Sequence, residues 1–225
     1  MNASSGQGAV LFDLDGTLTN PFAGITNSIA YALERMGEAV PDPATLDWCI
    51  GPPIWDSFRV LLSHPDEGRV NDAVAIYRER YGEVGKFENE LIEGVPEALE
   101  AIAGEQELPF FVATSKLERY SEHIIDHFDL RRFFRTVHGS QHDGTNAHKP
   151  DLLAHILEAE NLSASRTVMI GDRKHDIIGA KANDVCSIGV LWGFGAREEL
   201  EQAGADMIVE KPAELPSAVG ALLAV

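Results

Sequence analysis

Two aspartates at the end of the first apolar run are the residues best placed to do chemistry. Residues 9–17 read AVLFDLDGT, so Asp13 and Asp15 directly follow AVLF. Such a run is typical of a strand buried on both faces, which delivers its last residues to an open edge of a sheet. Like charges raise each other's pKa unless a cation separates them, so the pair indicates a bound cation, a shared proton, or both. The alternative is turn chemistry, for which Asp-Gly is common.

Two hydroxyl side chains end another apolar run. Residues 110–113 (FFVA) precede Thr114 and Ser115. Hydroxyls and free backbone amides at the start of a helix form an anion site that a phosphate group fits. Thr and Ser are also common N-caps, so helix capping alone is the competing interpretation.

A lysine and two more acids stand at later element boundaries. Lys149 precedes Pro150, which we expect to be the first residue of a helix. A positive charge there opposes the helix dipole, which favours a lysine that points into a site. Asp172 follows the apolar run 168–170, and Asp176 comes four residues later, a spacing that puts both carboxylates on one side of a helix. Each acid alone also has an explanation in the helix dipole.

The acids taken together suit a magnesium ion. The carboxyl ends of parallel strands gather at one edge of a sheet, so Asp13 and Asp172 are expected to lie close together. Hard oxygen ligands from these side chains and from the backbone carbonyl of Asp15 suit Mg²⁺, which keeps several waters and also contacts phosphate.

The elements that position these residues follow a regular alternation from residue 88 onward. Strands separated by helices of this length require parallel pairing with right-handed crossovers, which predicts an α/β fold with a doubly wound, Rossmann-like sheet. The expected strands cover 110–113, 134–138, 167–170, 186–191 and 207–209, and the expected helices cover 95–104, 117–128, 150–160, 174–183, 196–203 and 212–222.

Residues 20–87 break the alternation, because their patterns are helical and contain no strand-length β-branched run. This predicts a small all-α cap domain over 20–87, inserted into a core formed by 1–19 and 88–225. The insertion starts beside Asp13 and Asp15, so it is expected to lie over them as a lid. Helices are expected over 22–37, 54–63 and 67–82, with a short piece near 43–49.

Composition limits the partners. The formal charge of −18 argues against a nucleic-acid backbone or an anionic membrane as the main partner, since both demand a basic face. A small anionic substrate is compatible, because a bound cation and one or two lysines reverse the potential inside one pocket. No apolar stretch approaches the roughly 18 residues that a membrane span requires.

The N-terminal stretch MNASSGQG resembles neither a signal peptide nor a transit sequence. Cys49 and Cys186 are isolated in the sequence and are expected to be inert buried thiols in a reducing compartment. These observations predict a cytoplasmic protein, and they leave open whether it is a monomer or a homodimer.

Four motifs occur in the order seen in the haloacid dehalogenase-like superfamily, and the chain resembles that superfamily over nearly its whole length. The motifs are DLDGT at 13–17, the Thr-Ser turn at 114–115, Lys149 before a proline, and GDRKHD at 171–176. The helical insertion is similar to the cap after the first strand in the phosphoglycolate phosphatase-like branch.

The resemblance implies phosphoryl transfer through two aspartates. Asp13 is implied to be the nucleophile that forms an aspartyl-phosphate, and Asp15 to protonate the leaving alkoxide and then activate water. Dehalogenases of the superfamily lack the second acid, because a halide leaves without a proton. Asp15 therefore favours a phosphatase over a dehalogenase.

The same resemblance assigns the remaining site residues. Thr114 and Lys149 are implied to hold phosphoryl oxygens, and Gly16 and Ser115 to line the oxyanion site. The implied Mg²⁺ ligands are Asp13, Asp15 and Asp172, with Asp176 as an outer ligand or as the residue that orients Lys149. The family often has Asp where this chain has Asn20, which puts the hinge or the substrate fit in question more than the chemistry.

The substrate is expected to be a small phosphomonoester, with phosphoglycolate first. A nucleoside 5′-monophosphate is close behind, because GDRKHDIIGAKAND and LWGFG at 191–195 look like segments of 5′-nucleotidase-like relatives. The motifs also leave open a sugar-phosphate phosphomutase, and they disfavour a non-catalytic binding domain because the aspartates and Lys149 are all present. The cap residues that could select the substrate are the loop 50–53, the cations Arg59, Arg78, Arg80 and Lys86, and the aromatics Trp48, Trp55, Phe58 and Tyr77, while His148 and His175 flank the motifs.

Overall fold

The computed structural model describes residues 6–223, so residues 1–5 of the N-terminal stretch discussed above lie outside it. Six strands form one sheet in the order β5-β4-β1-β6-β7-β8, and all neighbouring strands are parallel. The strands are β1 (Gln7–Phe12), β4 (Phe110–Leu117), β5 (Phe134–Ser140), β6 (Leu162–Gly171), β7 (Cys186–Val190) and β8 (Met207–Val209).

The order of the strands identifies where ligands bind in such a sheet. The chain passes from β1 to β4 and β5 on one side, and then returns to β6 on the other side of β1. The carboxyl end of β1 is therefore at the switch point of a doubly wound sheet, where ligands bind. The predicted fold class is confirmed.

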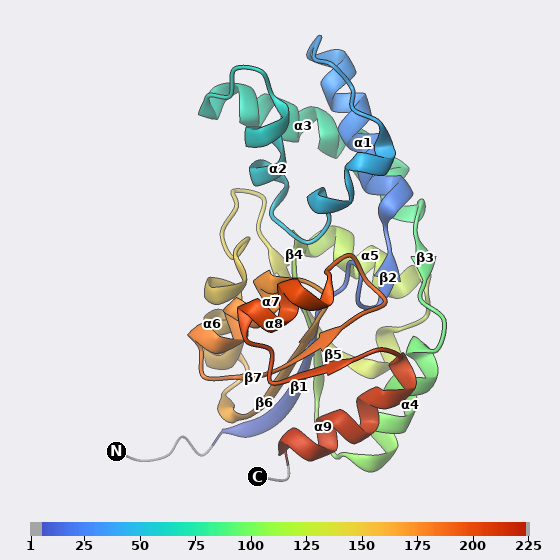
Figure 1. Cartoon of the computed structure of the whole chain (residues 1–225), viewed down its shortest axis with the longest axis vertical. Helices are drawn as coiled ribbons and strands as arrows, with labels where there is room; N and C mark the ends of the chain where they lie inside the picture. Colours follow the sequence, from blue (N-terminus) through green and yellow to red (C-terminus); the bar gives the residue numbers. More distant parts are fainter. Residues whose placement is uncertain (1–5, 224–225) are drawn as a thin grey trace.

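Alternate residues of β1 face two apolar layers, as the period of a strand requires. Val10 and Phe12 belong to the core on the face that α4 (Val95–Glu105) and α9 (Leu215–Leu223) cover. Ala9 and Leu11 belong to the core on the opposite face, which α6 (Lys149–Ala159) and α7 (Lys174–Ala182) cover. Two further helices, α5 (Glu118–His127) and α8 (Arg197–Ala203), complete the layers around the sheet (Figure 1).

A helical layer lies above the carboxyl end of the sheet (Figure 1). It contains α1 (Phe22–Arg35), α2 (Ile54–Leu61), α3 (Glu67–Glu83) and the 3₁₀ segments Pro43–Thr45, Asp47–Cys49 and Gly85–Phe87. We call these elements the cap. The cap has its own apolar core, which includes Ile29, Leu33, Phe58 and Tyr81. The division of the chain into two domains at residues 20 and 87 stays a prediction.

The sequence contained no signal for the two short strands that flank the cap. β2 (Thr19–Asn20) and β3 (Glu90–Leu91) pair antiparallel where the chain leaves and re-enters the core. Two residues are too few to show a strand period, so no pattern predicts this ladder. The side-chain oxygen Oδ1 of Asn20 accepts a hydrogen bond from the backbone N–H of Phe22 at 3.2 Å, so Asn20 supports the start of α1.

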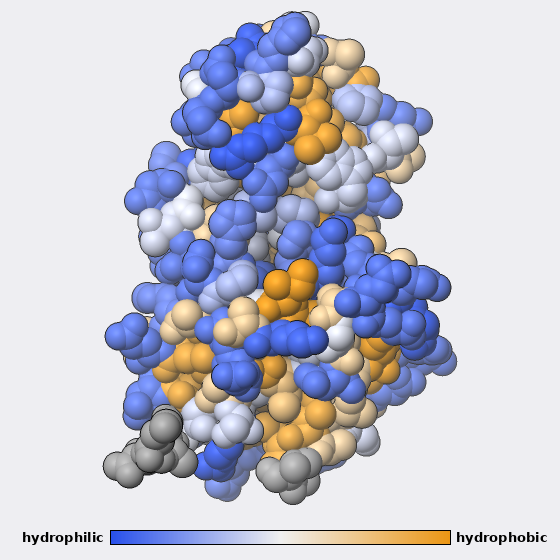
Figure 2. Space-filling view, turned by 60° about the vertical axis from the view of Figure 1, so that its left-hand side comes forward, coloured by the Kyte–Doolittle hydropathy of each residue, from blue (hydrophilic) through white to orange (hydrophobic). Residues whose placement is uncertain are grey.

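Several expected boundaries were wrong. Helix α6 begins at Lys149 rather than at Pro150, with His148 as its N-cap, because proline fits the first turn at more than one position. Cys49 is buried as expected, whereas Cys186 is partly exposed at the start of β7. Among residues 6–223, no helix combines the length and apolarity needed to cross a membrane. Figure 2 shows hydrophilic residues over much of the visible face.

Candidate active site

The carboxyl ends of the central strands bring together most of the residues that the sequence singled out. Asp13 directly follows β1, Thr114 lies within β4, and Asp172 directly follows β6. Lys149, the first residue of α6, joins them from the side. All four are at most 2% exposed. Parallel strands gather their carboxyl ends, so Asp13 and Asp172 meet at one place although they are far apart in sequence.

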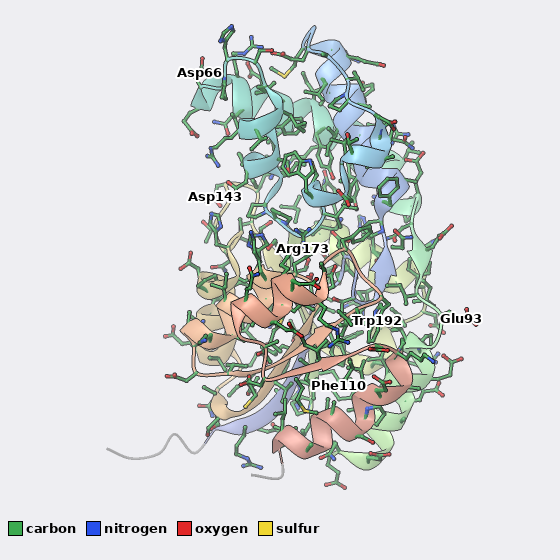
Figure 3. The ribbon with its side chains drawn as sticks, viewed as in Figure 1. Asp66, Glu93, Phe110, Asp143, Arg173 and Trp192 are labelled. Carbon is green, nitrogen blue, oxygen red and sulfur yellow. The ribbon has the colours of Figure 1, made fainter. Side chains whose placement is uncertain are left out.

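The loop after β1 approaches the loop after β6 so closely that only glycine fits. Gly16 has φ of +84°, a region that glycine adopts without strain, and a Cβ at this position would collide with the Asp172 carboxylate. The Nε1–H of Trp192 donates to the backbone oxygen of Thr17 at 3.0 Å and anchors the same loop (Figure 3).

Lys149 is the cation at the centre of the site. Its Nζ lies 2.9 Å from Oδ1 of Asp13 and 2.5 Å from Oδ1 of Asp176, and it donates to the backbone oxygen of Ala113 at 2.7 Å. Burial lowers the pKa of Lys149, but the two carboxylates outweigh burial and raise it overall. Lys149 therefore carries a positive charge in a buried place.

Asp172 and Asp176 are held by the backbone of their own loops. Oδ2 of Asp172 accepts a hydrogen bond from the backbone N–H of Phe194 at 2.8 Å, and Oδ2 of Asp176 accepts one from the backbone N–H of Arg173 at 3.1 Å. Burial and the charges of neighbouring carboxylates raise the pKa of Asp172 well above its usual value. Burial raises the pKa of Asp176 to about 6, although Lys149 opposes this shift.

The acidic cluster has the chemistry of a site for a hard divalent cation. One carboxylate oxygen from each of Asp13, Asp172 and Asp176 lies within 4.8 Å of the others. Buried like charges are costly unless a cation offsets them, and Lys149 supplies a single positive charge. An all-oxygen donor set of this kind fits Mg²⁺.

Asp15 has a lysine partner that the sequence patterns did not indicate. Its Oδ2 lies 2.7 Å from Nζ of Lys116, and Lys116 Nζ lies 2.5 Å from the hydroxyl oxygen of Tyr81 in α3. Burial raises the pKa of Asp15, Lys116 lowers it, and the balance is a raised pKa. Lys116 stands two residues after Thr114, and alternate residues of a strand share a face. The two-residue spacing from Thr114 is the sequence signal that could have identified Lys116 as a site residue.

A cavity between the sheet and the cap opens onto these groups. The residues that line it from the core include Asp13, Asp15, Thr114, Ser115 and Lys116. Those that line it from the cap include Trp55, Tyr77, Arg78 and Tyr81. Gly51 and Pro52 of the predicted substrate loop also line it. A guanidinium N–H of Arg173 donates to the backbone oxygen of Ile50, so a core side chain holds this loop (Figure 3).

The structure separates the candidate cap residues. Arg78 lines the cavity and stacks on Trp55, with 4.7 Å between its guanidinium carbon and the ring centroid. Arg59 and Arg80 pair with glutamates instead, and Lys86 faces His123. The remaining candidates lie elsewhere: Phe58 is in the cap core, Trp48 packs against that core, and His148 and His175 line a neighbouring cavity beside Lys149.

Comparisons with known proteins agree with this arrangement. The family model described as haloacid dehalogenase-like hydrolase matches residues 10–190. A protein named 5′-nucleotidase from Pseudomonas aeruginosa is 46% identical over 191 residues, which cover 85% of this chain and 86% of that protein. A protein named phosphoglycolate phosphatase from Colwellia psychrerythraea is 25% identical over 206 residues, which cover 87% and 89%. The crystal structure of a predicted phosphatase from Clostridium acetobutylicum matches with a TM-score of 0.90 and 38% identity, over 96% of this chain and 99% of that one.

Proposed function

The chain belongs to the haloacid dehalogenase-like hydrolase family and is a phosphoric monoester hydrolase, and from that premise we propose a Mg²⁺-dependent reaction through an aspartyl-phosphate on Asp13. The observation that carries the proposal is the ion pair between Asp13 and Lys149, at 2.9 Å, beside a second buried acid, Asp15. A carboxylate held this way is an oxygen nucleophile next to a positive group that attracts phosphate.

The two aspartates have different roles: Asp13 is the nucleophile, and Asp15 transfers the protons. An Asp13 oxygen attacks phosphorus, the bond from phosphorus to the ester oxygen breaks, and Asp15 gives that oxygen its proton. Water then attacks the phosphorus of the aspartyl-phosphate, Asp15 takes the proton from water, and Asp13 is released with inorganic phosphate. Burial raises the pKa of Asp15, which is the direction that a general acid requires.

The other site residues are proposed to bind the phosphoryl group and Mg²⁺. Thr114 and Lys149, with Ser115 and the backbone of Gly16, are proposed to bind the phosphoryl oxygens. The proposed Mg²⁺ ligands are Asp13, the backbone carbonyl of Asp15, and Asp172, and bound Mg²⁺ would polarise the phosphoryl group. Asp176 is proposed as an outer ligand or as the residue that orients Lys149, whose Nζ lies 2.5 Å from its Oδ1.

We propose a nucleoside 5′-monophosphate as the first candidate substrate. A relative of 46% identity bears the name 5′-nucleotidase, and the aromatic side chain of Trp55 in the cap lines the cavity, where it would stack on a nucleobase. Phosphoglycolate is the second candidate. It is favoured by Arg78, which lines the cavity and has no acidic partner among residues 6–223.

Phosphate release tests the proposal. Nucleoside 5′-monophosphates, phosphoglycolate and sugar phosphates are incubated with the protein and Mg²⁺, and we expect nucleotides to be hydrolysed with the highest kcat/KM. Absence of release from every ester would reject the proposed reaction, and conversion of one sugar phosphate into an isomer without release would identify a mutase. We further propose a cytoplasmic protein that acts as a monomer or homodimer.

A further inference from the structure

Three buried side chains connect the cap to the proposed proton carrier. Tyr81, on α3 of the cap, is 1% exposed, and its hydroxyl lies 2.5 Å from Nζ of Lys116. The same Nζ lies 2.7 Å from Oδ2 of Asp15, and the side chains of Lys116 and Asp15 are 7% and 9% exposed. A lysine side chain has many rotamers, and these two partners restrict its ammonium to one place.

Tyr81 is itself a rigid partner. Its ring stacks on Tyr77 with 5.2 Å between ring centroids and packs against Tyr120 at 5.5 Å. Nζ of Lys116 lies 4.5 Å from the centroid of the Tyr81 ring, so the ammonium packs against this rigid side chain at its hydroxyl end. The packing of the cap core therefore holds the Tyr81 hydroxyl in place, and this hydroxyl in turn holds the Lys116 ammonium.

The two oxygens of Asp15 are not equivalent. Oδ2 is engaged by Lys116, whereas Oδ1 is buried and has no hydrogen-bond partner among residues 6–223. A buried polar atom without a partner is uncommon and points to a function or a ligand. Asp15 lines the cavity between sheet and cap, and Oδ1 is the oxygen of Asp15 that no described protein group engages.

We propose that Tyr81 is a positioning residue for the reaction: it acts through Lys116 to hold Asp15 so that Oδ1 meets the ester oxygen. Tyr81 belongs to the cap, while Lys116 and Asp15 belong to the core, so the contact exists only when the cap lies over the core. This inference rests on the proposed role of Asp15 as proton carrier.

Single-turnover rates with two substrates, phenyl phosphate and 4-nitrophenyl phosphate, test the inference. The variant Tyr81→Phe keeps the packed ring and removes only the hydroxyl. 4-Nitrophenol leaves with little need of a proton, whereas phenol needs one, so we expect phenol release to slow about tenfold and 4-nitrophenol release to change less than about twofold. The matched control is Tyr31→Phe, which removes a cap hydroxyl from the exposed pair with Glu79. Both of its rates should match those of the wild type.

Two outcomes would overturn the inference. Equal slowing of phenol and 4-nitrophenol release would mark a merely structural role, and no slowing of either release would mark no role. The variant Lys116→Met provides an independent test and should show the same selective loss. In the Lys116→Met background, Tyr81→Phe should change the ratio of the two rates no further, because a residue that acts through Lys116 has no effect without it. A further selective loss contradicts the inference. If the wild type releases neither phenol nor 4-nitrophenol, the proposed function fails instead.

Discussion

At the residue scale, Lys149 sets the charge balance of the site. We expect Lys149→Met to lower kcat at least about a hundredfold, because the phosphoryl group loses a positive partner. We also expect the free energy of unfolding to fall by about 3 kcal/mol, because Asp13 and Asp176 are left as buried carboxylates without a counter-charge. Kinetics and urea unfolding measure the two effects.

The exposed Lys181 on α7 offers a matched control for this prediction. Lys181→Met makes the same chemical change at the surface, where substitutions alter stability by about 0.5 kcal/mol or less. A Lys149→Met variant that is as stable as Lys181→Met would contradict the account of the buried ion pairs.

The pKa values of Asp172 and Asp176 predict a dependence of stability on pH and Mg²⁺. Burial raises the pKa of Asp172 well above its usual value, and that of Asp176 from 3.8 to about 6. Without metal, the folded protein therefore binds more protons than the unfolded chain, and the free energy of unfolding decreases as pH rises from about 4 to 6. Mg²⁺ binds the ionised carboxylates, so its stabilisation increases over the same range.

Thermal unfolding with and without Mg²⁺ checks this prediction. We expect Mg²⁺ to raise Tm by more near pH 7.5 than near pH 5, since metal affinity depends on deprotonated ligands. An equal rise at both pH values, or a larger rise at the lower one, is the opposite of what these two buried acids require.

Sequence spacing predicted the positions of some site residues and not of others. Asp13, Asp15 and Asp172 are apparent because acids that directly follow apolar runs are unusual. Lys116 was missed, because a lysine after Thr-Ser is ordinary and its partner Tyr81 is 35 residues away. Contacts between elements distant in sequence leave no local pattern.

At the element scale, the ladder of β2 and β3 joins the cap to the core. Asn20 lies in this ladder and accepts a hydrogen bond from the Phe22 backbone. A carboxylate accepts the same bond and favours the start of a helix. We therefore expect Asn20→Asp to leave the turnover of 4-nitrophenyl phosphate within a few-fold of wild type. A loss as large as that of Asp13→Asn in the same assay would refute this structural role.

Apolar periodicity predicted the core elements well and their ends less well. Strands β4 and β6 are longer than the apolar runs that revealed them, because they continue into polar residues such as Lys116 and Ser163. The core fixes the middle of an element, whereas local hydrogen bonds fix its ends. The two-residue strands beside the cap had no period to detect.

At the scale of the whole molecule, we propose that the cavity between cap and core selects the substrate. Trp55 is the cap aromatic that both lines the cavity and stacks with Arg78. We expect Trp55→Ala to lower kcat/KM for adenosine 5′-monophosphate about tenfold relative to ribose 5-phosphate, which lacks the base, because stacking is lost. Trp48→Ala, at a tryptophan outside the residues that line this cavity, serves as the control.

Comparing adenosine 5′-monophosphate with ribose 5-phosphate distinguishes loss of base recognition from a general loss of activity. If Trp55→Ala reduces both rates by the same factor, the aromatic surface does not recognise a base. The sequence could not select Trp55 or Arg78 among the cap residues, because only the packing of α2 and α3 over the sheet shows which side chains reach the cavity. The charge of −18 gave no indication of a cavity that holds Lys116 and Arg78.

The central claim is that Asp13 carries the phosphoryl group between the two steps. In Asp15→Asn, attack on 4-nitrophenyl phosphate needs little proton donation, while hydrolysis of the intermediate lacks its base. Acid quenching followed by peptide mass spectrometry should therefore find one phosphoryl group on Asp13 in Asp15→Asn, and none in the Asp13→Asn, Asp15→Asn double variant. A phosphoryl group on another residue, or its absence while 4-nitrophenol is released in a burst, would contradict the account.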